Sequence, residues 1–419
     1  MAGPLTGIVV LDLGQVYSGP YCALLLAHLG ARIIKVEPPP AGEPLRSRGE
    51  SEASGESFNF QLLNGGKESL VLDLKAAAGL EAFRQLAQRA DVLVENFAPG
   101  TTARLGIDYP AVSGINPRIV YASVKAFAAD SVSSGLRGMD LTVQASSGVM
   151  SVNGYPDGPP LRCGPSLVDF LGGAHLAMGI LAALFERSVT GRGQSIEVAL
   201  QDAVIPTLAS NLSGWLTDPS APERTGNRHG GMLESPYNTY PAADGWVSVL
   251  CLTEAQWRGL CELIGRPDLR DDKELATSAG RVARMHMIDE VVGSWIIERT
   301  AAEAAEALQR AGVPAAKIAT LGQLFSGEMA RSSPMIQRSN GAGGEATYTF
   351  GSPVRLGNHP PRRSGPVPAL GQHTAAIMES LRAPSGDAGG LPPGDAGGLA
   401  PGAAGDGSAP LPQGGADGR

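Results

Sequence analysis

The sequence predicts an α/β fold, with an open parallel, Rossmann-like sheet in a large domain and a smaller α+β domain. One pattern, found twice, predicts the parallel sheet. Residues 7–13 and 31–37 are short apolar runs of strand length, and the intervening residues 20–30 begin with proline and end with glycine, as helices do. Residues 64–96 repeat this order of strand, helix and strand. The crossover helix brings the second strand back parallel to the first.

The other elements of the large domain follow in chain order. Residues 38–56 are rich in proline, glycine and charge, so we expect a surface-exposed loop. Residues 76–90 carry apolar side chains on one helical face, between expected strands at 64–74 and 91–96. Residues 117–124 add a further strand of the same sheet.

The longest apolar stretch holds a carboxylate near its start. We expect a helix from an N-cap at Ser166 to the glycine-containing break at residues 190–194, and then a strand at 195–200. The helix is apolar nearly all round, which favours burial on every side. Its glycine pair at 172–173 indicates close approach by another backbone or by a ligand.

Asp169 lies in the first turn of that expected helix. Together with Ser166 it resembles a capping box, and on spacing alone a capping role is favoured over catalysis. The positive end of the helix dipole favours an ionised Asp169. An ionised carboxylate in a sheltered cleft can also act as a nucleophile. The residues by themselves leave both roles open.

Composition excludes several classes of protein. The chain has 419 residues, a net charge of −8 and no basic run, so neither nucleic acid nor an anionic membrane is an expected partner. The longest apolar run is interrupted by His175 and is expected to be too short and mixed to span a membrane. Four scattered cysteines fit a reduced, cytoplasmic location, and no metal-ligand spacing is present.

The chain divides into segments of different composition. After the large domain, a mixture of strand and helix patterns predicts a small α+β domain, and a later segment returns to the large domain. The last residues are rich in glycine and proline, lack aromatic side chains and are expected to be disordered. The predicted segments are residues 1–224 and 331–383 for the large domain, 225–330 for the small domain and 384–419 for the tail.

Five stretches of the chain and the surroundings of Asp169 form a recognisable set of motifs. The stretches are 12–20 (DLGQVYSGP), 29–37 (LGARIIKVE), 67–74 (KESLVLDL), 90–100 (ADVLVENFAPG) and 190–194 (TGRGQ). Asp169 itself lies between a Gly-x-Ser-like turn and a glycine-bearing helix. Together these motifs resemble the family III CoA-transferases of the CaiB/BaiF type, to which formyl-CoA transferase and carnitine CoA-transferase belong.

The resemblance implies an activity and a set of site residues. It implies that CoA moves from an acyl-CoA thioester to a free carboxylic acid, with Asp169 as the nucleophile and neither a metal nor a permanently bound cofactor. It also implies an interlocked homodimer whose active site lies between the large domain of one chain and the small domain of the other. The residues it places on CoA are Gln15, Val16, Asn96, Phe97, Arg104 and Arg137.

The chain departs from the family pattern after the strand at 117–124. Residues 126–128 are Ala-Phe-Ala where the family has Gly-Phe-Gly, which narrows the allowed backbone. The α-methylacyl-CoA racemases, which share the family's fold, carry a Gly-His-Asp triplet after this strand. The corresponding residues 138–140 of this chain are Gly-Met-Asp, so Met139 takes the place of the histidine. Glu254 falls where the racemases carry a glutamate. Two alternatives to a transferase therefore stay open: a 2-methylacyl-CoA racemase and a non-catalytic CoA-binding homologue.

Overall fold

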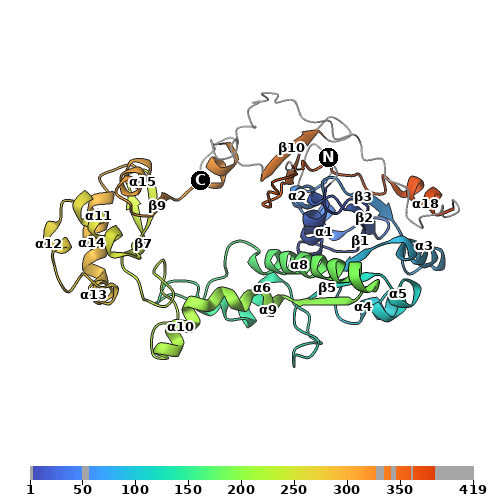
Figure 1. The fold of residues 1–419 in the computed structure, drawn as a ribbon, viewed down its shortest axis with the longest axis horizontal. Coiled ribbons are helices and arrows are strands. Elements are labelled where there is room, and N and C mark those ends of the chain that lie inside the picture. The colour runs from blue at the N-terminus through green and yellow to red at the C-terminus, as the bar shows by residue number, and fades with distance from the viewer. Residues whose placement is uncertain (1–2, 50–55, 327–334, 341–345, 360–361, 383–419) are drawn as a thin grey trace.

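The computed structural model describes residues 3–49, 56–326, 335–340, 346–359 and 362–382. Figure 1 shows two bodies joined by the segment that carries α10 (Ala209–Thr217). The expected disordered tail, residues 384–419, lies outside the described residues.

The first body is built on a six-stranded sheet in the order β3-β2-β1-β4-β5-β6. Every neighbouring pair in it is parallel, which confirms the parallel sheet predicted from the sequence. The chain starts at the centre, moves outward to β3 and then crosses back to the other side of β1. Ligands of such sheets bind where the order reverses, here at the carboxyl ends of β1 and β4. The strands are β1 (Val9–Asp12), β2 (Arg32–Glu37), β3 (Glu68–Val71), β4 (Val92–Glu95), β5 (Val120–Lys125) and β6 (Ser195–Ala199).

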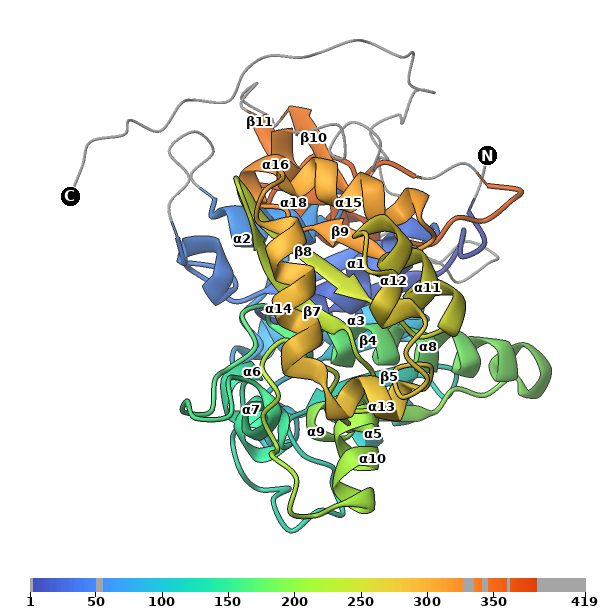
Figure 2. The same ribbon diagram turned by 90° about the vertical axis from the view of Figure 1, so that its left-hand side faces the viewer.

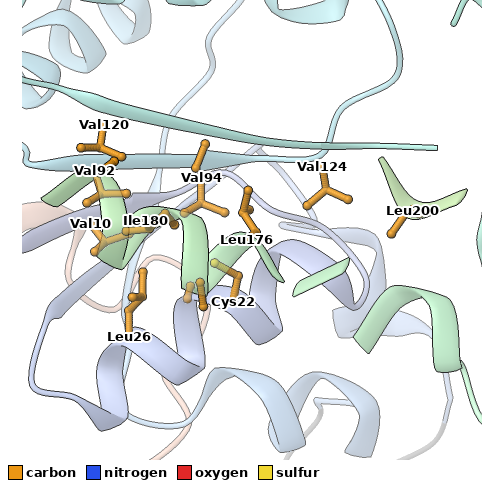
Figure 3. Packing of buried hydrophobic residues seen from close by; sticks show 14 of the residues in the cluster. Val10, Cys22, Leu26, Val92, Val94, Val120, Val124, Leu176, Ile180 and Leu200 are labelled. Atoms are coloured by element: carbon orange, nitrogen blue, oxygen red, sulfur yellow. The ribbon is translucent and has the colours of Figure 1, made fainter. Parts of the chain in front are cut away.

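Helices cover both faces of this sheet. On one face, α1 (Ser18–His28) and α8 (Leu167–Thr190) pack Cys22, Leu26, Leu176 and Ile180 against inward side chains of β1, β4 and β5 (Figure 3). On the other face lie α3 (Ala77–Arg89), α5 (Tyr109–Ile115) and α18 (Thr374–Arg382). Successive residues of a strand point to opposite faces of the sheet. Because helices cover both faces here, residues of both orientations must be apolar, and each strand reads as a continuous apolar run.

The expectation of a surface loop over residues 38–56 is wrong for part of that range. It contains a short 3-10 helix, η1 (Pro44–Ser47), whose Leu45 is only 2% exposed and whose Arg46 is only 4% exposed. Leu45 packs in a cluster with Phe60 of α2 (Phe58–Asn64), and Arg46 forms an ion pair with Glu37. A proline- and glycine-rich composition does not show that a charged side chain has a buried partner.

Helix α8 differs from its prediction on one side. Met178, Leu181, Phe185 and Val189 are 62%, 37%, 77% and 80% exposed, so the helix is not buried all round. By length and composition it could cross a membrane, contrary to the expectation from the sequence. Its inner side, however, packs in the core of the first body, as a central helix of a folded domain does.

The second body has its own sheet and its own core (Figures 1 and 2). Three antiparallel strands, β7 (Tyr237–Ala242), β8 (Gly245–Leu250) and β9 (Ala315–Lys317), pack against helices through Val247, Trp257 and Ile288. Its helices are α11 (Glu254–Leu263), α12 (Pro267–Arg270), α13 (Ser278–Ala283), α14 (Met285–Ile296) and α15 (Ala301–Arg310).

The chain then returns to the first body. The backbone N–H of Ser69 in β3 donates to Nδ1 of His373 at 3.1 Å, and that of Val71 donates to Oγ1 of Thr374 at 3.0 Å. These bonds attach α18 to the edge strand of the sheet. The remaining elements are α4 (Thr101–Leu105), α6 (Asp140–Ser146), α7 (Val149–Val152), α9 (Leu200–Val204), η2 (Ile205–Leu208), α16 (Leu321–Ser326), β10 (Ile336–Asn340) and β11 (Ala346–Phe350).

Candidate active site

A pocket lies at the carboxyl ends of β1, β4 and β5, beside the start of α8. It brings together Asp169 and most of the residues expected to bind CoA, although they come from distant parts of the chain. Arg104 does not line it. The lining residues are Gln15, Val16, Tyr17, Ser18, Asn96, Phe97, Ala98, Pro99, Val124, Lys125, Ala126, Leu136, Arg137, Gly138, Met139, Asp169 and Leu200.

The start of α8 is capped by Asp140. One Asp140 oxygen accepts the backbone N–H groups of Val168 at 2.9 Å and of Asp169 at 3.3 Å. Ser166 occupies the N-cap position, as the sequence predicts, but its side chain makes no capping bond. Within the described residues, the Asp169 carboxylate makes no hydrogen bond. A capping role therefore does not explain Asp169.

The surroundings of Asp169 disfavour its charge. Burial, followed by the neighbouring Asp140 carboxylate, raises the pKa of Asp169 from its ordinary value of 3.8 to about 7. The helix dipole favours the ionised form of Asp169, but burial and a like charge outweigh it. At neutral pH, the site holds both the acid and the carboxylate.

Tyr17 is a site residue that the sequence did not single out. It lines the pocket, and its ring stacks on Phe170 of α8 with the ring centroids 5.7 Å apart. Burial, and then the Asp169 charge, raise the pKa of the Tyr17 hydroxyl. Tyr21 meets the same Phe170 ring edge-on at 4.8 Å. These contacts make an aromatic wall beside the carboxylate.

The turn from β1 to α1 forms another wall of the pocket. The Asn96 amide accepts the N–H of Gln15 at 2.8 Å and donates to the Gln15 carbonyl at 2.8 Å. It also donates to the Ser18 hydroxyl at 3.1 Å. Asn96 is thus committed to holding the turn. Val16 has a φ of +63°, a conformation that costs a β-branched residue free energy and that clusters at functional sites.

Buried charges support this turn from below. Asp12 accepts the N–H of Gly14 at 2.8 Å, and the Lys35 ammonium donates to the Gly14 carbonyl at 2.9 Å. A second ammonium, that of Lys67, donates to Asp12 at 2.8 Å and to the Pro20 carbonyl at 2.9 Å. Although burial alone would raise it, Lys35 and Lys67 lower the pKa of Asp12. These motif residues support the site without lining it.

Phe97 is positioned by an ion pair at the ends of β4 and β5. Lys125 donates to the Glu95 carboxylate at 2.7 and 2.9 Å and to the Phe97 carbonyl at 3.0 Å. Glu95 in turn accepts the Phe97 N–H at 2.8 Å. Lys125 lines the pocket and was not predicted, because only the spatial neighbour Glu95 makes its role visible.

The two arginines expected to bind CoA differ in whether they line the pocket. Arg137 is exposed on the pocket lining and makes no hydrogen bond or ion pair within the described ranges, so its charge is available to an anion. Arg104 is also exposed, but it donates to Thr101 at 2.8 Å and lies outside the pocket. Sequence spacing could not show that Arg104 lies outside the pocket.

Other titratable candidates lie apart from this pocket. Glu254 begins α11 and pairs with Arg258 at 2.8 Å on the surface. The His175 ring contacts the Leu171 carbonyl at 2.8 Å within α8. In the part of the chain that the structure describes, no group of three or more His, Cys, Asp or Glu side chains could hold a metal ion.

The sequence profile of CoA-transferase family III matches residues 5–374. The chain belongs to this family. It is 36% identical over 397 residues to the formyl-CoA:oxalate CoA-transferase of Streptomyces avermitilis, covering 90% of this chain and 95% of that protein. It is 34% identical over 385 residues to the acetyl-CoA:oxalate CoA-transferase of Acetobacter aceti, covering 91% and 97%. A crystal structure of a CAIB/BAIF family protein from Brucella suis is 30% identical, with a TM-score of 0.79, and covers 91% and 100%.

In this CoA-transferase, the pocket presents the Asp169 carboxylate. Met139 lines the pocket where a racemase histidine is expected. A thioether neither gives nor takes a proton, so the pocket lacks that base. The N-termini of α1 and α8 both border the cavity, and such ends favour developing negative charge.

Proposed function

We propose that this transferase uses Asp169 as the nucleophile that carries CoA from an acyl-CoA to a free carboxylate. One observation supports this most directly. Asp169 is the carboxylate on the pocket lining, and it is free of any hydrogen bond within the described residues. It therefore has both oxygens available for attack. The turn at Val16 and the Tyr17 ring of the aromatic wall border the same space.

The proposed reaction proceeds through covalent steps that need no other reactant. The Asp169 carboxylate attacks the thioester carbonyl, forming an acyl-aspartyl anhydride and releasing CoA thiolate. The thiolate attacks the aspartyl carbonyl, giving an aspartyl-CoA thioester and the free donor acid. The acceptor carboxylate attacks this thioester, and the released thiolate attacks the acceptor carbonyl of the new anhydride. Acceptor acyl-CoA forms, and Asp169 is regenerated.

The residues proposed to hold CoA are those of the turn and its neighbours. Gln15 and Val16 border the pocket on one side, Asn96 fixes their backbone, and Phe97 offers an apolar ring to the thiol-bearing arm. Arg137 would meet a phosphate at the pocket mouth, since it is exposed and unpaired within the described residues. Arg104 remains in the proposal only as a surface cation beyond the pocket.

The substrates are proposed from the relatives. Their names pair acetyl-CoA or formyl-CoA with oxalate, and the Agrobacterium fabrum relative, 32% identical, is a succinate–glutarate CoA-transferase. We therefore propose short carboxylic acids as donors and acceptors. Acetyl-, formyl- and succinyl-CoA, each tested with oxalate, succinate and glutarate, form the first panel. Deuterium wash-in at Cα of a 2-methylacyl-CoA would support the racemase, and binding without exchange would support the non-catalytic homologue.

The proposal includes a homodimer in the cytoplasm. The exposed apolar side of α8 is a surface that a second copy could cover. The four cysteines, Cys22, Cys163, Cys251 and Cys261, are all free thiols, as expected in a reducing compartment.

Trapping tests the nucleophile. After incubation with a donor acyl-CoA, hydroxylamine should convert Asp169 to its hydroxamate, detected by peptide mass spectrometry. Asp169→Ala should lose exchange by at least about a thousandfold, since removal of a triad nucleophile costs roughly a millionfold. Asp268→Asn is the matched control, because Asp268 also lies in the first turn of a helix but is exposed on the second body. Full turnover in Asp169→Ala would overturn the proposal.

A further inference from the structure

We infer that Lys35 is a positioning residue for acyl-CoA, because its buried ammonium holds the β1–α1 turn in the strained form that lines the pocket. Lys35 itself does not line the pocket, and no substrate atom can reach its 0% exposed side chain. The inference rests on the proposed function, since it assigns the turn to acyl-CoA binding. It adds a residue that acts on the substrate only through Gly14.

The turn is held by side chains at four successive backbone groups. Asp12 accepts the Gly14 N–H, Lys35 donates to the Gly14 carbonyl, and Asn96 binds both the N–H and the carbonyl of Gln15. All four distances lie between 2.8 and 2.9 Å. Asp12 is the last residue of β1, Lys35 lies within β2, and Asn96 directly follows β4. The sheet itself therefore dictates the path of the turn.

The clamped peptides lead directly into Val16. A β-branched residue at a φ of +63° persists only where its surroundings fix it, because the backbone would otherwise relax. On the far side of Val16, helix α1 begins and is anchored by the Asn96–Ser18 bond. Gly14 and Gly19 approach so closely that a Cβ added to Gly14 would lie 2.8 Å from the Gly19 backbone. Releasing the Gly14 carbonyl frees one end of the strained segment.

Lys67 offers a natural comparison with Lys35. Both side chains are buried and both interact with Asp12. The other bond of Lys67 goes to the Pro20 carbonyl in the first turn of α1, whereas that of Lys35 goes to Gly14. Removing either ammonium leaves the same excess of buried negative charge. Only the removal of Lys35 takes away the hydrogen bond to the Gly14 carbonyl, in the turn just before Val16.

The charge imbalance can be corrected in both cases. Lys35 forms an ion pair with Glu43 at 2.9 Å, and Glu43 is 2% exposed. Lys35→Met combined with Glu43→Gln is therefore neutral overall, as is Lys67→Met combined with Glu43→Gln. Glu43→Gln alone is the reference for both.

The experiment measures KM for acyl-CoA, kcat, the Kd of free CoA and Tm for these three variants of the full chain. We expect Lys35→Met/Glu43→Gln to raise KM and Kd by about tenfold, the effect of one hydrogen bond from a charged donor, with a smaller change in kcat. Lys67→Met/Glu43→Gln should lower Tm as much as the Lys35 double variant does but raise KM by less, because the Gly14 carbonyl keeps its donor. Equal KM values for acyl-CoA in the Lys35 and Lys67 double variants would overturn the inference.

A double-mutant cycle tests whether Lys35 acts through Val16. Val16→Gly removes the strain in the turn. The fold-increase in KM of the double variant Val16→Gly/Lys35→Met should therefore be smaller than the product of the fold-increases of the two single variants. Independent, multiplicative effects would contradict the inference. If Lys35→Met does not fold, Lys35→Gln, which has a shorter polar side chain, enters the same cycle. A wild-type protein without exchange activity would reject the proposed function, whereas an active wild type with an unchanged KM in the Lys35 variants would reject only this inference.

Discussion

At the scale of single residues, Asp169, the proposed nucleophile, combines two opposed requirements. A nucleophilic carboxylate must be ionised, yet burial and Asp140 raise its pKa to about 7. A more basic carboxylate is a stronger nucleophile once ionised, because reactivity follows basicity. The same Asp140 that raises this pKa also caps α8 at the N–H groups of Val168 and Asp169, and so helps to fix the position of Asp169. Position and reactivity are set by one neighbour.

The pH dependence of exchange follows from that pKa. We expect kcat/KM to fall by about tenfold per pH unit below about 7 and to be level above it, since only ionised Asp169 attacks. Asp140→Asn keeps an oxygen for the capping bonds but removes the like charge, so the inflection should move to lower pH. Burial, the larger cause, should keep it above 3.8. A flat profile between pH 5 and 8 would contradict this assignment.

The same pKa has a consequence for stability. The folded protein retains the Asp169 proton up to a pH of about 7, whereas the unfolded chain releases it near 3.8. This stabilisation is complete below the unfolded value and is lost as the pH rises through the folded value. Asp169→Asn keeps the neutral form at every pH. Its Tm should therefore exceed that of the wild type by a few degrees at pH 8 and match it at pH 4, as calorimetry can measure. A lower Tm at pH 8 would show a structural role for the charge.

Single residues differ in how far the sequence could predict them. Asp169, Gln15, Val16, Asn96, Phe97 and Arg137 were predicted and lie on one pocket, but only through the resemblance to a family. Tyr17 and Lys125 were missed because their roles depend on Phe170 and Glu95, which are far away in the chain. Arg104 was expected in the site and lies outside the pocket.

At the scale of elements, the glycine pair of α8 shows how a helix positions the site. The sequence predicted a close approach there, and the structure confirms it. A Cβ on Gly173 would lie 2.6 Å from the Ser18 carbonyl oxygen of α1, whereas one on Gly172 would meet only the end of the Leu200 side chain. Gly173 therefore sets the distance between α1, which follows the Val16 turn, and α8, which carries Asp169.

Alanine substitutions at Gly172 and Gly173 distinguish the roles of the two glycines. Gly173→Ala should lower the free energy of unfolding by about 1–3 kcal/mol through overpacking against backbone, and should also reduce kcat/KM. Gly172→Ala should be nearly neutral, because Leu200 can rotate away and alanine favours the helix by about 1 kcal/mol over glycine. Urea denaturation and exchange assays measure both effects. Equal losses in the two variants would mean that contact with the α1 backbone does not decide the spacing.

At the scale of the whole molecule, strand composition predicted the parallel sheet but not its order. Apolar runs show that both sheet faces are covered, and a helix between strands shows that they run parallel. They cannot show that β4 crosses back beside β1, which creates the switch point where the pocket lies. Residues 38–56 were misjudged for a similar reason, since Arg46 is buried only because the distant Glu37 is its partner. The division of the chain into domains at the predicted residues stays a prediction.

The outer side of α8 leads to the last prediction, which concerns assembly. Met178, Leu181, Phe185 and Val189 recur at helical spacing on one stripe, and each is at least 37% exposed. A contiguous apolar stripe on a central helix is typical of a surface covered by another chain, and a second copy is the partner we propose. Phe185→Glu places a charge in the middle of that stripe. Light scattering should give a homodimer mass for the wild type and about half that mass for the variant, with much reduced exchange activity. Val132→Glu, at a fully exposed loop position, should stay dimeric. A monomeric, fully active wild type would reject the homodimer.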